Sequence, residues 1–213
     1  SAIAAKRQYT AYQNMKTAFG EQKEGECPKL KTDFDELVWM IGNISGVQAL
    51  LNDGASDGAV GVPRDIAAKV ERNMKCLEND KWWGVPRGAR AAVWNLLPML
   101  APPNAEPWKE LEASAKAGFD GGVRLGSALY AMSAFSKGDD ERMRKAIRLC
   151  VRLADHPAYK DIILERVTPT DAELASDDAL DDWLMRNAGT SHHVSGTCKM
   201  GPDTDPMAVV DQS

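Results

Sequence analysis

The sequence of 213 residues contains no run of 18 uninterrupted apolar residues, the length that a helix needs to cross a bilayer. It also has no excess of basic residues, since the net charge is −5 and the pI is near 5.3. Tight binding to nucleic acid requires a basic surface, so we expect no nucleic-acid partner. The N-terminus shows no charged segment followed by an apolar one, as a signal peptide would.

Motifs that hold phosphates or metal ions are missing as well. The sequence has neither a GxGxxG motif after a strand nor a GxxxxGK[ST] motif, and it has neither HExxH nor DxDxDG. We therefore predict no nucleotide-phosphate loop and no metal site. The four cysteines, Cys27, Cys76, Cys150 and Cys198, are far apart in the sequence. They are free thiols, or they form up to two disulfides with three possible connectivities.

The composition is that of a soluble globular protein, with 44% hydrophobic and 27% charged residues in a length that allows one or two domains. Residues 208–211 read like the start of a strand, and a strand needs pairing partners, so we expect this chain to be a piece of something larger. The start without methionine is compatible with an organellar protein after removal of a targeting peptide. The sequence does not otherwise identify a compartment.

Apolar residues recur at helical spacing along most of the chain. The strongest stripe runs through Leu37, Met40 and Ile44 and follows Thr32, which stands with Asp35 at the spacing of a capping box. Proline and glycine mark the limits of the other helices. We predict helices at 33–51, 63–78, 86–100, 107–118, 123–136, 140–154 and 177–187.

The fold class predicted from this pattern is mainly α. Residues 1–137 form a helical bundle, and residues 138–213 form a helix–helix–loop–strand segment. The boundary near Gly138 follows from a change in composition. After Gly189, glycines, prolines and short β-branched runs replace the helical period.

Several conspicuous residues have an ordinary structural interpretation. The glycosylation sequon at Asn43 lies inside the strongest helix, so we expect it to be accidental. The pair Trp82–Trp83 suits packing better than stacking on a ring ligand. His156 precedes Pro157 at a helix end, where a capping or surface role is expected.

A basic stripe at Arg144, Arg148 and Arg152 has helical spacing. We expect the stripe to face solvent or to pair with the acidic run at 177–182. The alternative is a binding site for an anion or for a partner protein.

Two further histidines, His192 and His193, lie in a loop of small and polar residues at 190–202. Functional residues favour loops held by a rigid scaffold, which makes this loop the main candidate for a catalytic or ligand site.

The segment from about 139 to 211 resembles the C-terminal region of the glucose–methanol–choline (GMC) family of FAD-dependent oxidoreductases. Residues 193–201, HVSGTCKMG, fit the family loop H-x-x-G-T-C-x-M-G. Asp205-Pro206 with Val209-Val210-Asp211 fits the stretch after the loop, and the helix at 177–184 fits the one before it. Residues 1–137 resemble no family that we recognise.

The resemblance implies a flavin-dependent alcohol oxidation. His193 matches the family's catalytic histidine, and Thr197, Cys198 and Met200 match positions beside the flavin ring. A histidine suits proton transfer because its ordinary pKa lies near working pH. The FAD would be bound mainly by residues outside this chain, so we expect no activity from the chain alone, a partner chain or complex, and a small alcohol as substrate. The alternative is a non-catalytic helical accessory subunit of a larger membrane-associated complex, respiratory or photosynthetic.

Overall fold

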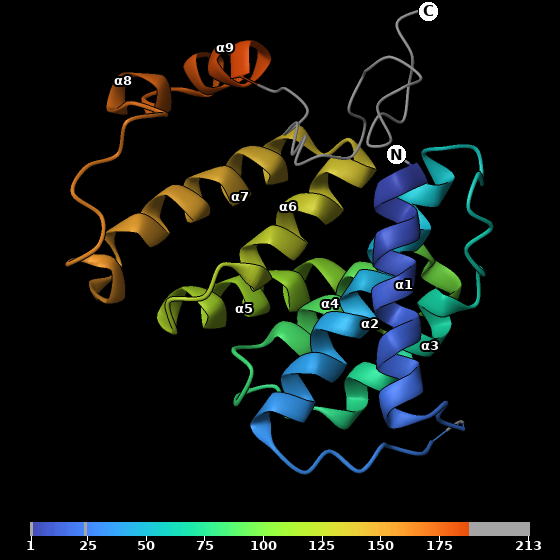
Figure 1. The fold of residues 1–213 in the computed structure, drawn as a ribbon. Helices are drawn as coiled ribbons and strands as arrows, with labels where there is room; N and C mark the ends of the chain where they lie inside the picture. The colour runs from blue at the N-terminus through green and yellow to red at the C-terminus, as the bar shows by residue number, and fades with distance from the viewer. Residues whose placement is uncertain (1, 24, 188–213) are drawn as a thin grey trace, which may run out of the picture. The chain divides into compact units, whose positions relative to one another are not determined.

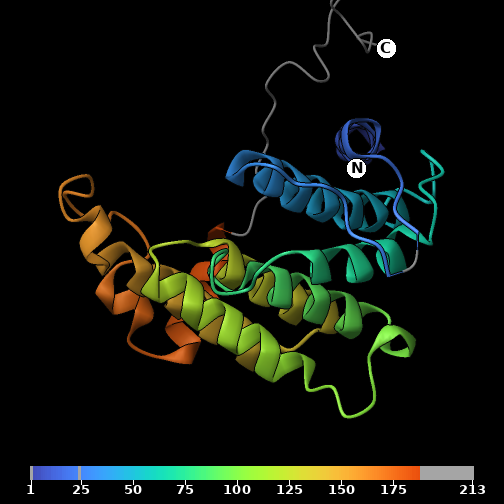
Figure 2. The ribbon, with the colours of Figure 1, turned by 90° about the horizontal axis from the view of Figure 1, so that it is seen from below.

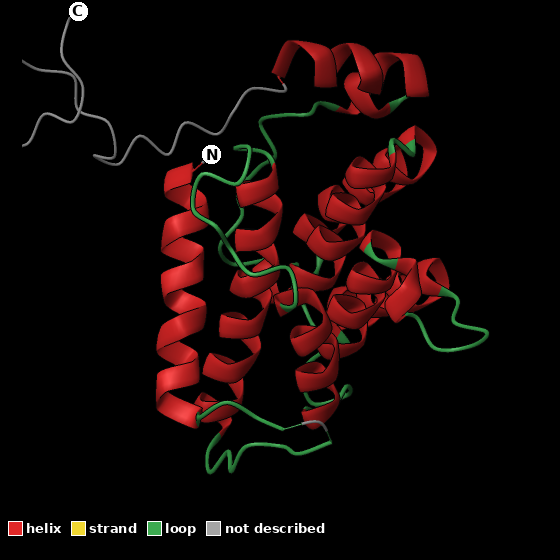
Figure 3. Ribbon diagram, turned by 90° about the vertical axis from the view of Figure 1, so that its right-hand side faces the viewer, coloured by secondary structure: helices red, strands yellow, loops and turns green. Residues whose placement is uncertain are grey.

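The structure is a computed structural model that describes residues 2–23 and 25–187. Within these ranges it is built from helices, as predicted, and shows no strand (Figures 1 and 3). The strand predicted at 208–211 lies outside them. The chain divides into two compact units, residues 1–168 and 169–213.

The first unit contains α1 to α7 and the second contains α8 and α9. The α-helices are α1 (Ala2–Phe19), α2 (Asp33–Gly54), α3 (Ile66–Asn73), α4 (Val85–Leu96), α5 (Pro107–Asp120), α6 (Leu125–Lys137), α7 (Asp140–Arg152), α8 (Asp171–Leu174) and α9 (Asp177–Asn187). Short 3-10 turns follow three of them, at η1 (Met74–Cys76), η2 (Pro98–Leu100) and η3 (Leu153–Asp155), and η4 (Pro157–Tyr159) lies just beyond η3.

Helix α1 was not predicted, and it packs against α2, beside which Figure 2 shows it end-on. Its buried residues are only Ala5, Tyr12 and Met15, a sparse stripe within a polar sequence. The close approach depends on two glycines of α2, because a Cβ at Gly42 would collide with Met15 and a Cβ at Gly46 with the Tyr12 ring. The glycines at this i, i+4 spacing were the sequence signal for a partner helix.

The helices predicted at 63–78 and 86–100 are clearly shorter in the structure. Helix α3 ends at Asn73, where the 3-10 turn η1 follows, and it begins at Ile66 because the Asp53 carboxylate accepts hydrogen bonds from the Val60 and Val62 backbone N–H groups and holds the chain before it in a loop. Helix α4 ends at Leu96 rather than at residue 100. Pro98 lacks an N–H and disfavours the α conformation at the residue before it, so the chain continues as a 3-10 turn.

One hydrophobic core joins the helices of the first unit. It includes Trp39 of α2, Val70 of α3, Leu111 of α5, Tyr130 of α6 and Ala146 of α7. The core therefore continues past residue 138, where composition placed a boundary. That boundary between a bundle and a family-like segment stays a prediction.

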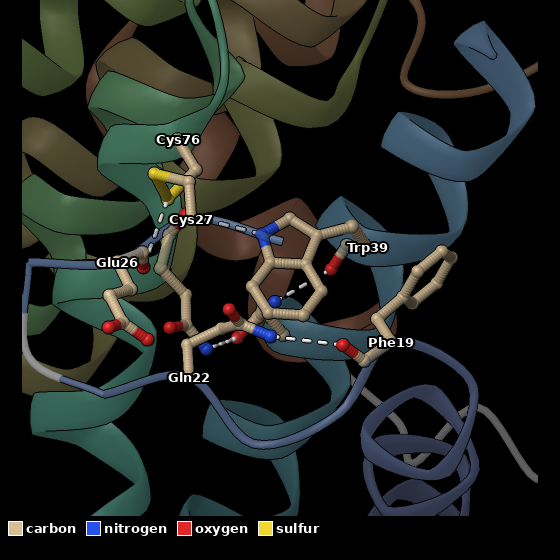
Figure 4. The surroundings of a disulfide bond; sticks show 8 residues. Phe19, Gln22, Glu26, Cys27, Trp39 and Cys76 are labelled. Atoms are coloured by element: carbon tan, nitrogen blue, oxygen red, sulfur yellow. Dashed lines mark hydrogen bonds between the residues drawn. A yellow bond between two sulfur atoms is a disulfide. The ribbon is translucent and has the colours of Figure 1, made fainter. Parts of the chain in front are cut away.

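A disulfide joins Cys27, in the loop between α1 and α2, to Cys76 in η1 (Figure 4). Trp39 lies beside it, with Nε1 donating to the Asn73 carbonyl oxygen at 3.2 Å and Phe19 edge-on to its ring at 5.9 Å. The disulfide thus anchors a loop that has no regular structure of its own. Cys150 is a free thiol, and Cys198 lies outside the part of the chain that the structure describes.

None of the helices seen at 2–23 and 25–187 is both long enough and apolar enough to span a membrane. The Asn43 sequon is confirmed as accidental, because the Asn43 side chain is fully buried and donates to the Trp39 carbonyl oxygen at 2.8 Å.

Candidate functional site

The predicted site residues His193, Thr197, Cys198 and Met200 lie outside the described residues, so their roles stay predictions. What the structure describes is the framework that precedes their loop in the chain. That framework runs from the α5–α6 turn through α7 and on to α8 and α9.

Helices α8 and α9 are tied to each other by Glu173. Its Oε2 accepts from the Thr170 backbone N–H at 2.7 Å, and Thr170 Oγ1 accepts in return from the Glu173 N–H, which completes a capping box. The bond from the Thr170 backbone is the main reason that the pKa of Glu173 is lowered. Arg186 of α9 reaches the same carboxylate at 3.4 Å. A charged Glu173 therefore holds the pair together.

Helix α9 was predicted at 177–187 and is found at those residues. Its start is capped by Ser176, whose Oγ accepts from the Ala179 N–H at 3.1 Å, and Asp177 and Asp178 stand at its positive end. Leu180 is its fully buried residue. At its last residue, the Asn187 side chain donates to the Trp183 carbonyl oxygen at 2.8 Å. Since α9 ends at Asn187, only five residues separate this helix from His193.

His156 is confirmed as a capping residue. Its Nδ1 accepts from the Ala158 backbone N–H at 3.2 Å, and its Nε2 lies 3.2 Å from the Asp120 carbonyl oxygen, to which it donates in the matching tautomer. Both ring nitrogens are engaged with the backbone, which gives His156 a structural role.

Aromatic and cationic side chains join the α5–α6 turn to the end of α7. The Tyr159 hydroxyl donates to the Gly122 carbonyl oxygen at 2.6 Å, and the Phe119 and His156 rings meet edge to face at 6.0 Å. The Arg152 guanidinium lies 5.3 Å from the Phe119 ring centre. One member of the basic stripe thus packs on an aromatic ring, and the pairing of the stripe with the acidic run stays a prediction.

The two adjacent tryptophans serve packing, as predicted. Trp82 is buried and its Nε1 donates to Glu36 Oε2 at 2.6 Å. Trp83 lies edge to face with it at 5.8 Å, and its ring touches Gly121. A Cβ at Gly121 would collide with that ring, so the α5–α6 turn depends on glycine there.

The buried Tyr130 reaches a charged pair at the surface of the bundle. Its hydroxyl donates to Glu112 at 3.2 Å, and Lys145 of α7 donates to the same oxygen at 2.8 Å. Burial, followed by the Glu112 charge, raises the pKa of Tyr130 to about 12, so its hydroxyl stays protonated. Burial also raises the pKa of the Cys150 thiol, which makes that cysteine a poor nucleophile. These groups stabilise the packing of α5, α6 and α7.

No group of three histidine, cysteine, aspartate or glutamate side chains suited to a metal ion occurs within residues 2–23 and 25–187. The same residues contain three large apolar side chains that the motif analysis overlooked. Ile162, Leu164 and Val167 are 74%, 99% and 76% exposed within six positions of one another. They lie in the irregular stretch between η4 and α8.

Comparison with known proteins finds relatives of the C-terminal part of the chain. Residues 121–213 match the family model described as GMC oxidoreductase. The oxygen-dependent choline dehydrogenases of Photobacterium profundum and Vibrio vulnificus are 39% and 36% identical to this chain over 74 residues, which are 35% of this chain and 13% of each relative. The enzyme of Pseudomonas savastanoi pv. phaseolicola is 38% identical over 76 residues, 36% of this chain and 13% of the relative. No solved structure matches the chain.

The C-terminal region of the chain therefore resembles the GMC oxidoreductases, and the resemblance begins earlier than the residue 139 expected from the motifs. The chain spans only 13% of the length of these relatives. The segment matched by the family model, residues 121–213, contains α6 to α9 together with the histidine loop.

Proposed function

We propose that this chain contributes the histidine loop to a GMC-like, FAD-dependent alcohol oxidoreductase and is inactive by itself. The observation that carries the proposal is the family match over 121–213, which includes the whole of the loop at 193–201. The helix that precedes the loop is capped at its start by Ser176 and joined to α8 by the Arg186–Glu173 ion pair, which gives the loop an ordered attachment.

The flavin would take up the hydride that leaves the alcohol carbon. Within this chain, His193 would accept the proton of the substrate hydroxyl, and Thr197, Cys198 and Met200 would line the ring. The sequence has no GxGxxG motif after a strand, so most of the FAD site would lie in protein outside these 213 residues.

The substrate class follows from the relatives. They are named choline dehydrogenases, so choline and other small alcohols are the first substrates to test. A partner is supported by the exposed side chains Ile162, Leu164 and Val167, which lie within the family-like segment.

The decisive assay measures flavin absorbance and choline-dependent reduction of an artificial electron acceptor by the native assembly. Replacing a general base lowers turnover by about 10²–10⁴-fold, and we expect this of His193→Ala. His192→Ala is the matched control and should lower turnover much less, because only His193 has the family spacing to Gly196 and Thr197. An assembly without flavin and without activity would contradict the proposal and favour the accessory-subunit alternative.

The partner surface can be tested separately. Leu164→Glu should weaken assembly with the FAD-binding part, while changing the stability of this chain by no more than about 0.5 kcal/mol, because the side chain is fully exposed here. Size-exclusion chromatography of the mixed components measures the first effect and thermal unfolding the second. Leu164→Gln, which removes the apolar side chain without adding charge, is the control for added negative charge, and assembly left unchanged by Leu164→Gln would argue against an apolar contact at Leu164.

A further inference from the structure

An open pocket lies beside the Cys27–Cys76 disulfide, whose surroundings Figure 4 shows. Its volume is about 580 Å³, within the range of small-molecule sites, about 300–1,000 Å³. Ala18 and Phe19 of α1 line it on one side, and Asp35 of α2 lines it on another. Cys27 lines the pocket and is exposed, whereas Cys76 is only partly exposed and is not part of the lining. A molecule in the pocket therefore meets the disulfide from the side of Cys27.

The segment that carries Cys27 is irregular. Residues 25–31 belong to no helix. The Glu26 and Leu30 N–H groups donate to the carbonyl oxygens of Lys23 and Pro28, close by in the same segment. Thiol–disulfide exchange requires that a thiolate reach one of the two sulfurs, so exposed disulfides exchange more readily than buried ones. The exposure of Cys27 on such a segment makes this disulfide open to exchange.

The charges that line the pocket select the class of thiol. Lys29 and Lys31 line it, and both are exposed. Asp35 is the third charged residue of the lining, and its Oδ2 already accepts from the Lys31 backbone N–H at 2.9 Å. Glu26, the neighbour of Cys27, lies outside the lining. Two ammonium groups and one carboxylate complement a ligand that carries two carboxylates and one ammonium group, because opposite charges attract at short range.

We propose that Cys27 is a site of reversible S-thiolation by a small thiol that carries carboxylate groups, of which glutathione is an example. The ligand thiolate attacks Cys27 Sγ and forms a mixed disulfide, while the Cys27–Cys76 bond breaks and Cys76 leaves as a thiolate that takes up a proton from water. The incoming thiol is oxidised and Cys76 is reduced, so the step needs no other oxidant or reductant. Attack of Cys76 on the mixed disulfide reverses it.

The attacked sulfur is identified by treating the folded full chain with glutathione, blocking free thiols with N-ethylmaleimide and analysing tryptic peptides by mass spectrometry. Trypsin separates the two cysteines, because Cys27 lies in the peptide 24–29 and Cys76 in the peptide 76–81. We expect glutathione on Cys27 and N-ethylmaleimide on Cys76. The reverse pattern overturns the proposal, and so does the absence of any adduct on a chain that keeps its helical circular dichroism spectrum.

The role of the two lysines is tested with thiols of opposite charge. Lys29→Gln/Lys31→Gln should slow exchange with glutathione about three- to tenfold at low ionic strength, but should not slow exchange with cysteamine, which carries an ammonium group. Each thiol is compared with itself on the two proteins, so its intrinsic reactivity cancels. The backbone bond from residue 31 to Asp35 does not depend on the lysine side chain, so the variant should fold.

The matched control is Lys6→Gln/Lys137→Gln, which removes the same charge from exposed positions outside the pocket. Its exchange rate with glutathione should stay within about twofold of the wild-type rate. Equal slowing by the two double variants, or equal slowing of glutathione and cysteamine by Lys29→Gln/Lys31→Gln, overturns the proposal. None of these measurements requires flavin or an alcohol substrate, so failure here is distinct from failure of the proposed redox function.

Discussion

At the scale of single residues, Asp53 shows how one carboxylate shapes a loop. It stands in the last turn of α2, and its oxygens accept from the Val60 N–H at 2.8 Å and from the Val62 N–H at 2.7 Å. These bonds, the one from Val60 foremost, lower the pKa of Asp53. The charged form is therefore the form that holds the loop before α3.

Asp53→Asn should lower the stability of the protein at neutral pH, because an amide cannot accept both N–H groups as a carboxylate does. The folded-state pKa lies below the ordinary value of about 3.9, so the wild-type advantage is complete above about pH 4 and disappears as the pH falls through the folded-state pKa. Urea unfolding of both proteins from pH 7 down to pH 2.5 measures this difference.

The exposed neighbour Asp57 provides the control for that experiment. Asp57 has a positive φ of 54°, which asparagine tolerates well, so Asp57→Asn should leave the urea midpoint nearly unchanged at every pH. A constant difference between wild type and Asp53→Asn across the whole pH range would show that the charge of Asp53 is not what holds the loop.

Residue roles were predictable from sequence where the partners are local. Thr32 and Asp35 form the expected capping box, since both members lie within one turn of α2. The partners of Asp53 are seven and nine positions away in an irregular loop, and no periodicity reveals them.

At the scale of elements, one buried residue contributes most to the packing of α9. Leu180 is fully buried, whereas Trp183, expected from the helical stripe to be an inward anchor, is only partly buried. An indole is too large to be covered completely on so short a helix, whereas the smaller leucine side chain is covered.

Leu180→Ala should destabilise the packing of α9 by about 2–5 kcal/mol, the usual range for a buried leucine, and Trp183→Ala should cost less. Amide hydrogen exchange along α9 measures the local loss directly. Met185→Ala on the same helix is the control, because Met185 is 83% exposed. A larger loss of protection in Trp183→Ala than in Leu180→Ala would contradict this assignment.

Helices with a strong apolar stripe and clear capping, proline or glycine residues at their ends were predictable, as α2, α5, α6 and α9 show. Helix α1 was not, since its burial depends on glycines of α2 rather than on its own hydrophobicity. The short α8 was missed for another reason, because a four-residue helix is defined by the Thr170–Glu173 capping box and has no periodicity to detect.

At the scale of the whole molecule, the disulfide is the longest covalent constraint seen in the described part of the chain. It joins positions 49 residues apart and secures the loop between α1 and α2 to η1. Closing a loop of this length restricts the unfolded chain, and such a bond contributes about 2–4 kcal/mol.

Reduction should therefore lower the unfolding temperature of the wild-type protein, with a loss of about 2–4 kcal/mol in the free energy of unfolding. The double variant Cys27→Ser/Cys76→Ser should already unfold at the lower temperature, and a reductant should not lower it further. Cys150→Ala should keep the full response to reductant, because Cys150 is a free thiol. A double variant that still responds to reductant would show that this pairing does not account for the stability.

The crossing of α4, α5 and α6 has a consequence for how this sequence can evolve. Gly88 and Ser114 lie before the segment that the family model matches, residues 121–213, and Gly126 lies within it. The three residues meet so closely that a Cβ at either glycine would collide with Ser114. Mutations on the two sides of residue 121 are therefore not independent. In descendants that keep both parts, a larger side chain at position 126 would persist only with a compensating change across the crossing.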